Sequence, residues 1–479
     1  MLRANPPWDP ITEAYARAVA TMQSRPSDDP TSWGYQAAIH GAYAPPPPGA
    51  RWNECQHANW FFLPWHRMYL FFFERIVRAA VVGNGGPANF ALPYWNYDQA
   101  APRNTLPEPF RTPTLPDGTA NPLFLAAARR NSAIATGAEL PPVITSSRAA
   151  MRERRFDGPP GAGFGGVRRD PGTFGGTFGA LEQTPHNVVH VQVGGAGNGA
   201  CQGGLMIDPN CAALDPIFWL HHANIDRLWN RWLSQGGRAN PTSSRWLNQS
   251  FAFVDENGAV VSMTPAEVLD NDGQLDYVYD DDLPASPETV IMTPGPSDQP
   301  EPQRPPEMVA ASDAPVQLTG APVSVPLAVP ASTRDRVSSD AVVAATAEGP
   351  RAVYLNVEDI EAPRNPGVVY GVFVNLPPHA NPVVRAQHHV GNITVFGVES
   401  VNDPDKAHDT VPGFRHTFDI TPFVVQQTAA GAWDPNTLNV TFEPVAPIAP
   451  DTGGEMDAPE VTTSATTPIR IGRVSLFVS

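Results

Sequence analysis

The 479-residue sequence predicts a mainly α domain, an antiparallel helix bundle, followed by an all-β domain that is a sandwich or a barrel. Three observations predict this order. Before residue 240 apolar residues recur at helical spacing, whereas residues 336–479 alternate apolar and polar in segments such as VVYGVFVNL and LNVTFEPV. A proline-dense stretch between these regions has the composition of a semi-rigid linker. The chain is also too long for one ordinary core, so two or three domains are expected.

Five helices are predicted in the N-terminal region. The first covers residues 12–23. Each of the other four carries one or two histidines, and they begin after Asp28, at Pro64, after Thr184 and after Asp215. The last two starts each combine an N-cap residue with a first-turn proline, which is typical of helix N-termini. Helices that face inward in an antiparallel bundle are the usual way to build a dinuclear metal site.

The domain boundaries follow composition. We expect a helical catalytic domain in residues 1–240, a short β segment completing it in 241–284, a Pro-rich linker in 285–335 and the β domain in 336–479. Residues 100–180 are rich in Pro, Gly and Arg, so we expect loops with one or two short helices there. The glycine-rich part of that region is expected to form a flexible rim over a site.

Charge and cysteine content exclude several classes of protein. The net charge of -17 disfavours nucleic acid and anionic membrane surfaces as partners. No run approaches the ~20 apolar residues of a membrane span, and the N-terminus lacks an apolar signal region. We therefore expect a soluble protein, either cytoplasmic or exported with its signal removed; the oligomeric state is not predicted. Three cysteines cannot form a disulfide framework, so Cys201 and Cys211 either pair or remain free thiols.

Six histidines form two sets of three, each embedded in aromatic-rich sequence. His40, His57 and His66 lie in HGAY and CQHANWFFLPWHR; His186, His190 and His222 lie in TPHNVVH and DPIFWLHHANIDRLW. Neutral imidazole suits copper, zinc, iron and nickel, and three such ligands leave positions open for a substrate. His186 and His190 are four residues apart and share one helix face. The adjacent residues His221 and His222 point roughly 100° apart, so only one of them can face a metal, and helix geometry does not choose between them.

No Asp or Glu in these histidine blocks is a candidate for a ligand that bridges two metal ions. Dinuclear hydrolases usually bridge hard ions with Asp or Glu, whereas six histidine ligands favour copper. Copper in turn implies redox chemistry with dioxygen.

The blocks HGAY, CQHANWFFLPWHR, ExxPHNxVH and DPIFWLHHANIDRLW resemble those of tyrosinases and polyphenol oxidases, the type 3 dinuclear copper proteins. SRWLNQSFAFVDENG and LDYVY are similar to the segment that follows the copper domain in plant-type enzymes. The resemblance covers nearly the whole chain, more weakly in the β domain. It implies two copper ions per chain, O2 as co-substrate, and small phenols that are ortho-hydroxylated or, as o-diphenols, oxidised to o-quinones. The alternatives are a catechol oxidase or o-aminophenol oxidase without monophenolase activity, and a hemocyanin-like oxygen carrier.

The resemblance also assigns roles to individual residues. One copper would be held by His40, His57 and His66, and the other by His186, His190 and His222, which leaves His221 as a packing or supporting residue. The Cys-x-His arrangement implies a thioether between Cys55 and His57, with a buried free thiol as the alternative. Glu182 and Asn187 would orient a water that accepts a phenol proton, and their alternative role is to stabilise the helix start.

Two expectations concern access to the site. Plant catechol oxidases similar to this chain carry a shielding Phe shortly before the last copper histidine, where this sequence has Pro209. The entrance is therefore expected to be more open, with Val191 at its edge. The β domain is expected to be a lid that makes the enzyme latent; the alternative is a module for stability or oligomerisation. The sequence does not identify a residue that would plug the pocket.

Overall fold

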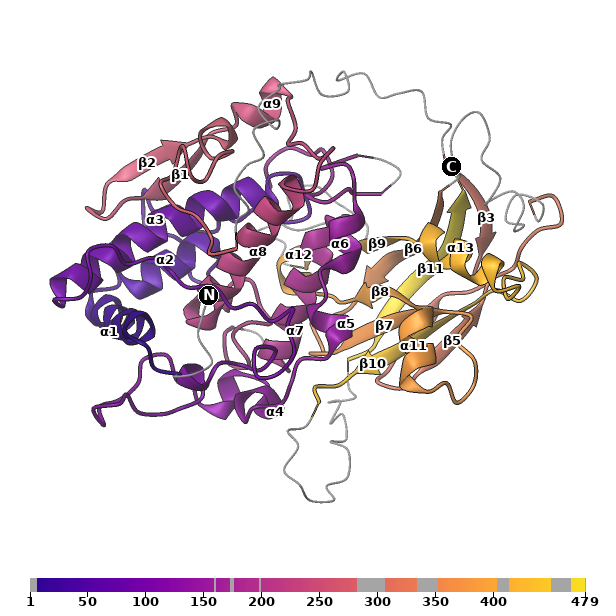
Figure 1. Ribbon diagram of the computed structural model, residues 1–479, viewed down its shortest axis with the longest axis horizontal. Helices are drawn as coiled ribbons and strands as arrows, with labels where there is room; N and C mark the ends of the chain where they lie inside the picture. The colour runs from indigo at the N-terminus through magenta and orange to yellow at the C-terminus, as the bar shows by residue number, and fades with distance from the viewer. Residues whose placement is uncertain are drawn as a thin grey trace.

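The computed structural model describes residues 7–158, 161–172, 176–197, 200–281, 306–333, 352–402, 413–448 and 467–478. A helical domain and a β domain lie side by side in it (Figure 1). The predicted order, mainly α and then all β, is confirmed. None of the described helices combines the length and the apolar character needed to cross a membrane.

Three long helices form the centre of the helical domain: α1 Pro10–Ser24, α3 Phe62–Gly83 and α8 Ile217–Leu233. The shorter helix α2 Trp33–His40 ends on a histidine, and its start is capped by the Ser32 hydroxyl, which accepts the Tyr35 N–H at 3.2 Å. Helices α3 and α8 are joined by a buried ion pair, in which Arg67 Nε lies 2.6 Å from Asp226 Oδ1. These four helices agree with the sequence-based prediction to within a few residues.

The helix predicted after Thr184 is divided into two pieces. Glu182–Asn187 forms a π-helical segment within which Thr184 is extended, at φ -146° and ψ 120°, and α7 follows at Val188–Gly194. Pro185 lacks the N–H that a continuous helix would need at this point. The break at Thr184 precedes both histidines of this region, His186 in the π-helical segment and His190 in α7.

The region between α3 and α7 contains more helix than we predicted. It has the short α-helices α4 Ser132–Ala135, α5 Pro142–Thr145 and α6 Arg148–Arg152, and the 3-10 turns η1 Glu108–Phe110 and η2 Ala127–Arg129. The glycine-rich stretch that we expected to form a flexible rim is closely packed at Gly166. Gly166 has φ +122° and packs so closely that a Cβ would lie 2.6 Å from the Asn59 carbonyl oxygen. Glycine is needed there for close packing, not for mobility.

Small elements on either side of α8 complete the helical domain. The turn η4 Ala212–Leu214 precedes α8, and α9 Ser244–Leu247, the strands β1 Phe251–Val254 and β2 Val260–Met263, and η5 Pro265–Glu267 follow it. The hairpin β1–β2 packs on α3, where the Phe253 ring stacks on Phe72 at 5.6 Å.

The β domain is a sandwich of two antiparallel sheets. One sheet has the order β5-β10-β7-β8, and the other has β3-β11-β6-β9 with β4 also paired to β11. The strands are β3 Glu307–Ala311, β4 Val316–Leu318, β5 Val323–Pro326, β6 Val353–Glu361, β7 Val369–Val374, β8 His389–Ile393, β9 Phe414–Asp419, β10 Asn439–Val445 and β11 Ile469–Val478. Its helices are α11 Pro382–His388, α12 Val398–Val401 and α13 Thr421–Ala429. The register pairs buried Val357 with Val474 and buried Val372 with Phe442, so both sheets contribute to one apolar core.

The predicted linker over residues 285–335 is wrong in its C-terminal part. Strands β3, β4 and β5 lie at residues 307–326 and belong to the sandwich, so the β domain begins well before residue 336. These strands are only three to five residues long and are surrounded by proline. Such short segments lack the alternation by which strands are recognised in sequence. The first part of the predicted linker lies outside the described residues.

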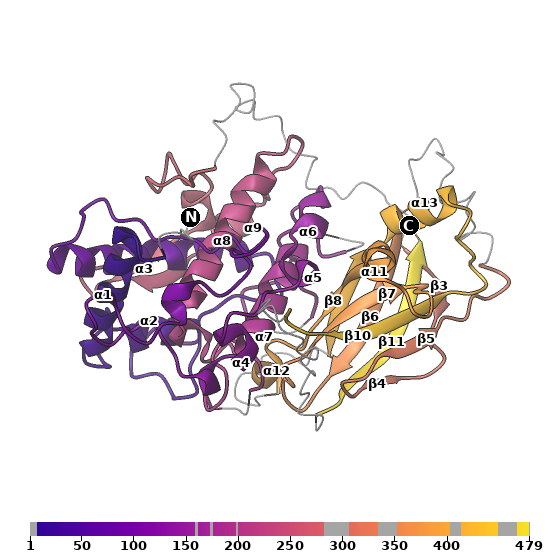
Figure 2. The same ribbon diagram turned by 60° about the horizontal axis from the view of Figure 1, so that its bottom comes forward.

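The two domains are in direct contact, and both views place β8 and α12 toward the helical domain (Figures 1 and 2). Asn392 Nδ2 donates to the Val143 carbonyl at 2.6 Å, and Gln192 Nε2 donates to the Val445 carbonyl at 2.8 Å. Backbone groups of Glu139 and Ile448 exchange two hydrogen bonds. The side chain of Phe396, in the β domain, is part of the helical domain's apolar core.

Candidate metal centre

The first histidine group lies where α2 ends and α3 begins. His40 is the last residue of α2, His57 lies in the loop before α3, and His66 lies in the first turns of α3. All three rings are almost completely buried. Their candidate ligand atoms, together with Cys55 Sγ, lie within 4.8 Å of one another.

The second histidine group comes from α7 and its preceding segment on one side and from α8 on the other. His222 Nε2 lies 3.3 Å from His186 Nε2 and 3.4 Å from His190 Nε2. A metal ion about 2.0–2.1 Å from each nitrogen, at tetrahedral angles, would hold its ligands about 3.3–3.4 Å apart. The two distances from His222 thus match the ligand spacing that one ion requires.

The two groups are neighbours. The rings of His66 and His222 stack with centroids 4.4 Å apart and an interplanar angle of 12°, and the His57 and His186 rings are 5.7 Å apart. Two buried sets of imidazoles at this separation fit a dinuclear copper site.

Hydrogen bonds orient three of the histidine rings so that Nε2 is the nitrogen available to a metal ion. His40 Nδ1 donates to the Pro209 carbonyl, His66 Nδ1 to Phe62 and His190 Nδ1 to Met206, at 2.7–2.8 Å. A carbonyl oxygen only accepts, so Nδ1 carries the proton and Nε2 keeps its lone pair in each neutral ring. Burial lowers the pKa of all six rings, that of His40 to about 4, so the rings are neutral at pH 7.

His221 is also close to the second group but is oriented differently. Its ring stacks on His186 at 5.3 Å and is tilted by 31° against the Tyr97 ring at 5.6 Å. Neither of its nitrogens has a hydrogen-bond partner among the described residues. No Nε2 contact as short as those of His222 links it to His186 or His190 within the described residues. The geometry therefore favours His222 as the third ligand.

Cys55 lies against the His57 ring. Its sulfur is 3.1 Å from Nδ1 and 3.8 Å from Nε2, so it lies on the side of the ring that carries Cε1, the carbon between these nitrogens. The thiol is buried and unpaired with another cysteine, and burial raises its pKa. In contrast, Cys201 and Cys211 form a disulfide, which decides between the two alternatives left open by the sequence.

Glu182 holds the loop that carries His57. Its carboxylate oxygens accept the Ala58 N–H at 2.9 and 3.1 Å, and Ala58 has the uncommon left-handed φ of +52°. Burial raises the pKa of Glu182, although backbone hydrogen bonds oppose the shift. Asn187 Oδ1 accepts from His186 Nδ1 at 2.8 Å, while its Nδ2 is buried without a partner. Both residues are thus adjacent to histidines of the two groups.

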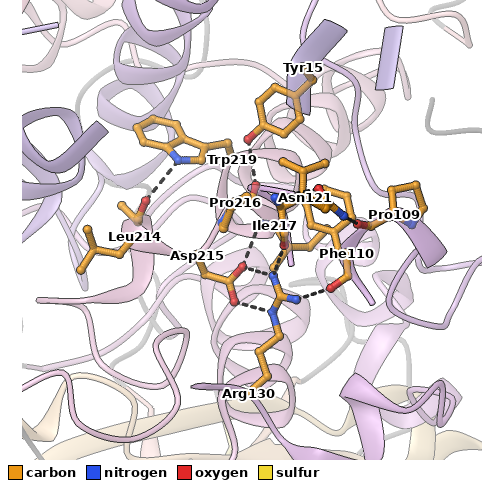
Figure 3. A network of polar contacts seen from close by, with 12 residues as sticks. Tyr15, Pro109, Phe110, Asn121, Arg130, Leu214, Asp215, Pro216, Ile217 and Trp219 are labelled. Carbon is orange, nitrogen blue, oxygen red and sulfur yellow. Dashed lines mark hydrogen bonds and ion pairs between the residues drawn. The ribbon is translucent and has the colours of Figure 1, made fainter. Parts of the chain in front are cut away.

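Helix α8 is anchored at its start by a buried ion pair (Figure 3). Arg130 binds Asp215 through two hydrogen bonds of 2.8 and 2.5 Å and also donates to the Phe110 carbonyl. Asp215 Oδ1 in turn accepts the Ile217 N–H at 3.1 Å, and Tyr15 donates to the Pro216 carbonyl. These contacts hold the first turn of α8 in place and therefore help to set the position of His222 relative to the other histidines.

Phe396 of the β domain covers the site. Its ring centroid lies 4.5 Å from that of His190, tilted by 31°, and 5.8 Å from that of His186. The side chain is completely buried. Sequence analysis missed this residue because NITVFGV has the pattern of an ordinary strand, and no local signal marks a side chain that is buried in another domain.

The open entrance expected from Pro209 and Val191 is not present in this structure. Val191 is completely buried, and Pro209 acts through its carbonyl on His40. The physical reason is that Phe396 fills the space over the second histidine group.

Comparison with known proteins agrees with this geometry. The common central domain of tyrosinase matches residues 30–235, the polyphenol oxidase middle domain matches residues 240–286, and a domain of unknown function matches residues 305–479. A tyrosinase of Hahella sp. (strain CCB-MM4) is 34% identical over 461 residues, which cover 90% of this chain and 92% of that protein.

Plant proteins are also similar to this chain. The latent, chloroplastic polyphenol oxidase of Prunus armeniaca is 33% identical over 309 residues, 58% of this chain and 48% of that protein, so the match spans about half of the plant protein. The structure of a latent apple tyrosinase superposes with a TM-score of 0.58 and 23% identity, covering 98% of this chain and 95% of that one. This likeness extends the shared fold to the β domain.

Proposed function

The chain belongs to the tyrosinase family of copper-dependent phenol oxidases, and from this premise we propose that it hydroxylates monophenols at the ortho position and oxidises o-diphenols to o-quinones, with O2 as co-substrate. The observation that carries the proposal is the position of His222 Nε2, 3.3 Å from His186 Nε2 and 3.4 Å from His190 Nε2, beside a second buried set of imidazoles.

We assign His40, His57 and His66 to one copper ion and His186, His190 and His222 to the other. The neutral rings support this assignment, and the carbonyls that accept from Nδ1 of His40, His66 and His190 leave Nε2 of these three rings unprotonated. The buried Nε2 of His40 has no hydrogen-bond partner. The copper pair, when bound, supplies the binding and reduction of dioxygen. The protein keeps the rings in place, excludes water and presents an apolar surface to an aromatic ring.

Glu182 and Asn187 are proposed to orient a water that takes the phenol proton. A carboxylate offers about four acceptor positions, so Glu182 can accept the Ala58 N–H and a water together. Its raised pKa makes it a stronger base than an exposed glutamate. The unpartnered Asn187 Nδ2 provides a donor for the same water.

The position of Cys55 supports a thioether to His57. Such a bond replaces the S–H and one ring C–H, and the two electrons and two protons released would reduce one molecule of dioxygen to hydrogen peroxide. The peptide containing both residues should therefore lack two hydrogens in mass spectrometry and resist thiol alkylation. An alkylated Cys55 in the copper-loaded protein would contradict the link.

We also propose that the β domain keeps the enzyme latent and that Phe396 is the plug. Its ring occupies the position over His190 that a substrate ring would take. Replacing Phe396 with Ala should raise the turnover of a catechol by the full chain. Phe423→Ala, which changes the β-domain core without contacting the site, serves as the matched control. If the Phe396 variant and protein cleaved between the domains both turned over catechol at the rate of the intact, unaltered chain, the β domain would not be a lid.

The experiment that tests the overall proposal combines copper analysis with two assays. Two copper ions per chain, oxidation of a catechol, and hydroxylation of a monophenol after a lag are the expected results. Catechol oxidation without monophenol hydroxylation would leave a catechol oxidase or o-aminophenol oxidase. Reversible oxygen binding without sustained quinone formation, even after cleavage between the domains, would indicate an oxygen carrier.

A further inference from the structure

One loop touches a histidine from each group. We define the carbonyl loop as residues 201–211, between α7 and η4. The Met206 carbonyl in it accepts from His190 Nδ1, and the Pro209 carbonyl accepts from His40 Nδ1, both at 2.8 Å. The two rings belong to different proposed copper ions, so this short segment orients one ligand of each.

The ends of the carbonyl loop are joined covalently. Cys201 and Cys211 form a disulfide, with Cα atoms 5.6 Å apart. Within the loop, Asp208 Oδ1 accepts the Asn210 N–H at 2.9 Å, and the Asp208 carbonyl accepts the Cys211 N–H at 2.9 Å. The disulfide therefore closes a compact turn in which the two carbonyls lie only three residues apart.

The carbonyl loop is also tightly packed on both sides. A Cβ added to Gly41, which follows His40, would lie 2.7 Å from the Pro209 carbonyl oxygen. A Cβ added to Gly194, the last residue of α7, would lie 2.3 Å from the Ile207 N. Gly41 has an extended backbone, φ -171°, that any residue can adopt, so glycine is required there by the loop itself.

We propose that the Cys201–Cys211 disulfide is a positioning element shared by both copper sites, because it fixes the carbonyls that orient His40 and His190. The inference rests on the proposed ligand sets. A loop free to move would lose both Nδ1–H contacts, and each ring could rotate its Nε2 away from the metal. Supporting contacts of this kind change metal affinity by roughly 10–100-fold.

The test uses the copper-loaded full chain and the double variant Cys201→Ser with Cys211→Ser. We expect both copper ions to be lost in parallel during dialysis against a chelator, roughly 10–100-fold more readily than from the unaltered chain. The rise in Tm that copper causes should shrink, while the Tm of the copper-free protein changes less. Reduction and alkylation of the folded, unaltered chain provides the same change without a substitution.

Gly41→Ala and Gly194→Ala divide the effect between the two sites. The first should weaken copper binding at the His40 site and the second at the His190 site, each leaving one copper per chain. Equal losses of Tm with and without copper, and unchanged copper retention, would show that the disulfide only stabilises the fold and would overturn the inference. An unaltered chain that binds fewer than two copper ions would instead overturn the proposed function, so the two failures are distinguishable.

Discussion

The group formed by His186, His190 and His222 comes only from helical segments, namely the π-helical segment before α7, α7 itself and α8. The group formed by His40, His57 and His66 comes from a helix end, a loop and a helix start. In the group of His186, His190 and His222, helix geometry sets the spacing of the rings, and the buried Arg130–Asp215 ion pair holds α8 in place. In the group of His40, His57 and His66, individual polar contacts hold the loop that carries His57. We infer that the positions of ligands on helices depend on the stability of the whole domain, whereas the positions of ligands on a loop depend on a few neighbouring atoms.

The largest expected effect comes from removing a helical ligand. His222→Gln should lose one of two copper ions and reduce catechol turnover by more than the roughly 10–100-fold that a supporting contact is worth. His221→Gln, its neighbour on α8, is the matched control and should keep both ions. Metal analysis and turnover check this pair. Copper loss in the His221 variant alone would reverse the ligand assignment.

The anchor of α8 is expected to matter for stability. Arg130→Met leaves Asp215 buried without its cation, and we expect the free energy of unfolding to fall by about 3–5 kcal/mol. Arg231→Met near the other end of α8 removes a partly exposed pair with Asp281 and should cost only about 0–1 kcal/mol. Urea denaturation of the copper-free chain measures both values. Similar losses in both variants would show that α8 is not held mainly at its start.

The loop group should respond to Glu182→Gln. The amide can accept only through its single oxygen, so the Ala58 N–H and the loop with His57 are held less firmly. We expect copper retention at the first group to drop by roughly 10–100-fold, with the second group unaffected. Chelator dialysis followed by copper analysis tests this, and Glu267→Gln on the surface is the control. Loss of both ions together would contradict a local role.

The smallest effect is expected at Glu153, which lies outside both groups. Burial, and then the charge of Asp419 in the β domain, raise the pKa of Glu153 to about 7, above its unfolded value of about 4.3. Its charged form is therefore disfavoured in the folded chain, so stability falls as the pH rises from about 4.3 through 7. Glu153→Gln should raise Tm above pH 7, leave it unchanged near pH 4, and not alter copper content. A Tm difference that is the same at both pH values would contradict this.

The sequence was sufficient for the features that depend on short-range pattern. The long helices and the two histidine groups follow from spacing, capping and family resemblance. Features that depend on contacts between distant segments were missed. The strands at residues 307–326 are too short to alternate visibly, the break at Thr184 depends on its neighbours, and Phe396 acquires its position only when the β domain docks.

Tyr277 and Tyr279 both donate to Asp226 Oδ2 at 2.6 Å, and this carboxylate is paired with Arg67. The last described stretch of the helical domain is thereby tied to the same helices that carry His66 and His222. A protease that cuts beyond residue 281 would leave both tyrosine hydrogen bonds to Asp226 intact. The helical fragment released by such a cut would keep these hydrogen bonds at its C-terminal end, so we expect it to stay folded after the β domain is removed.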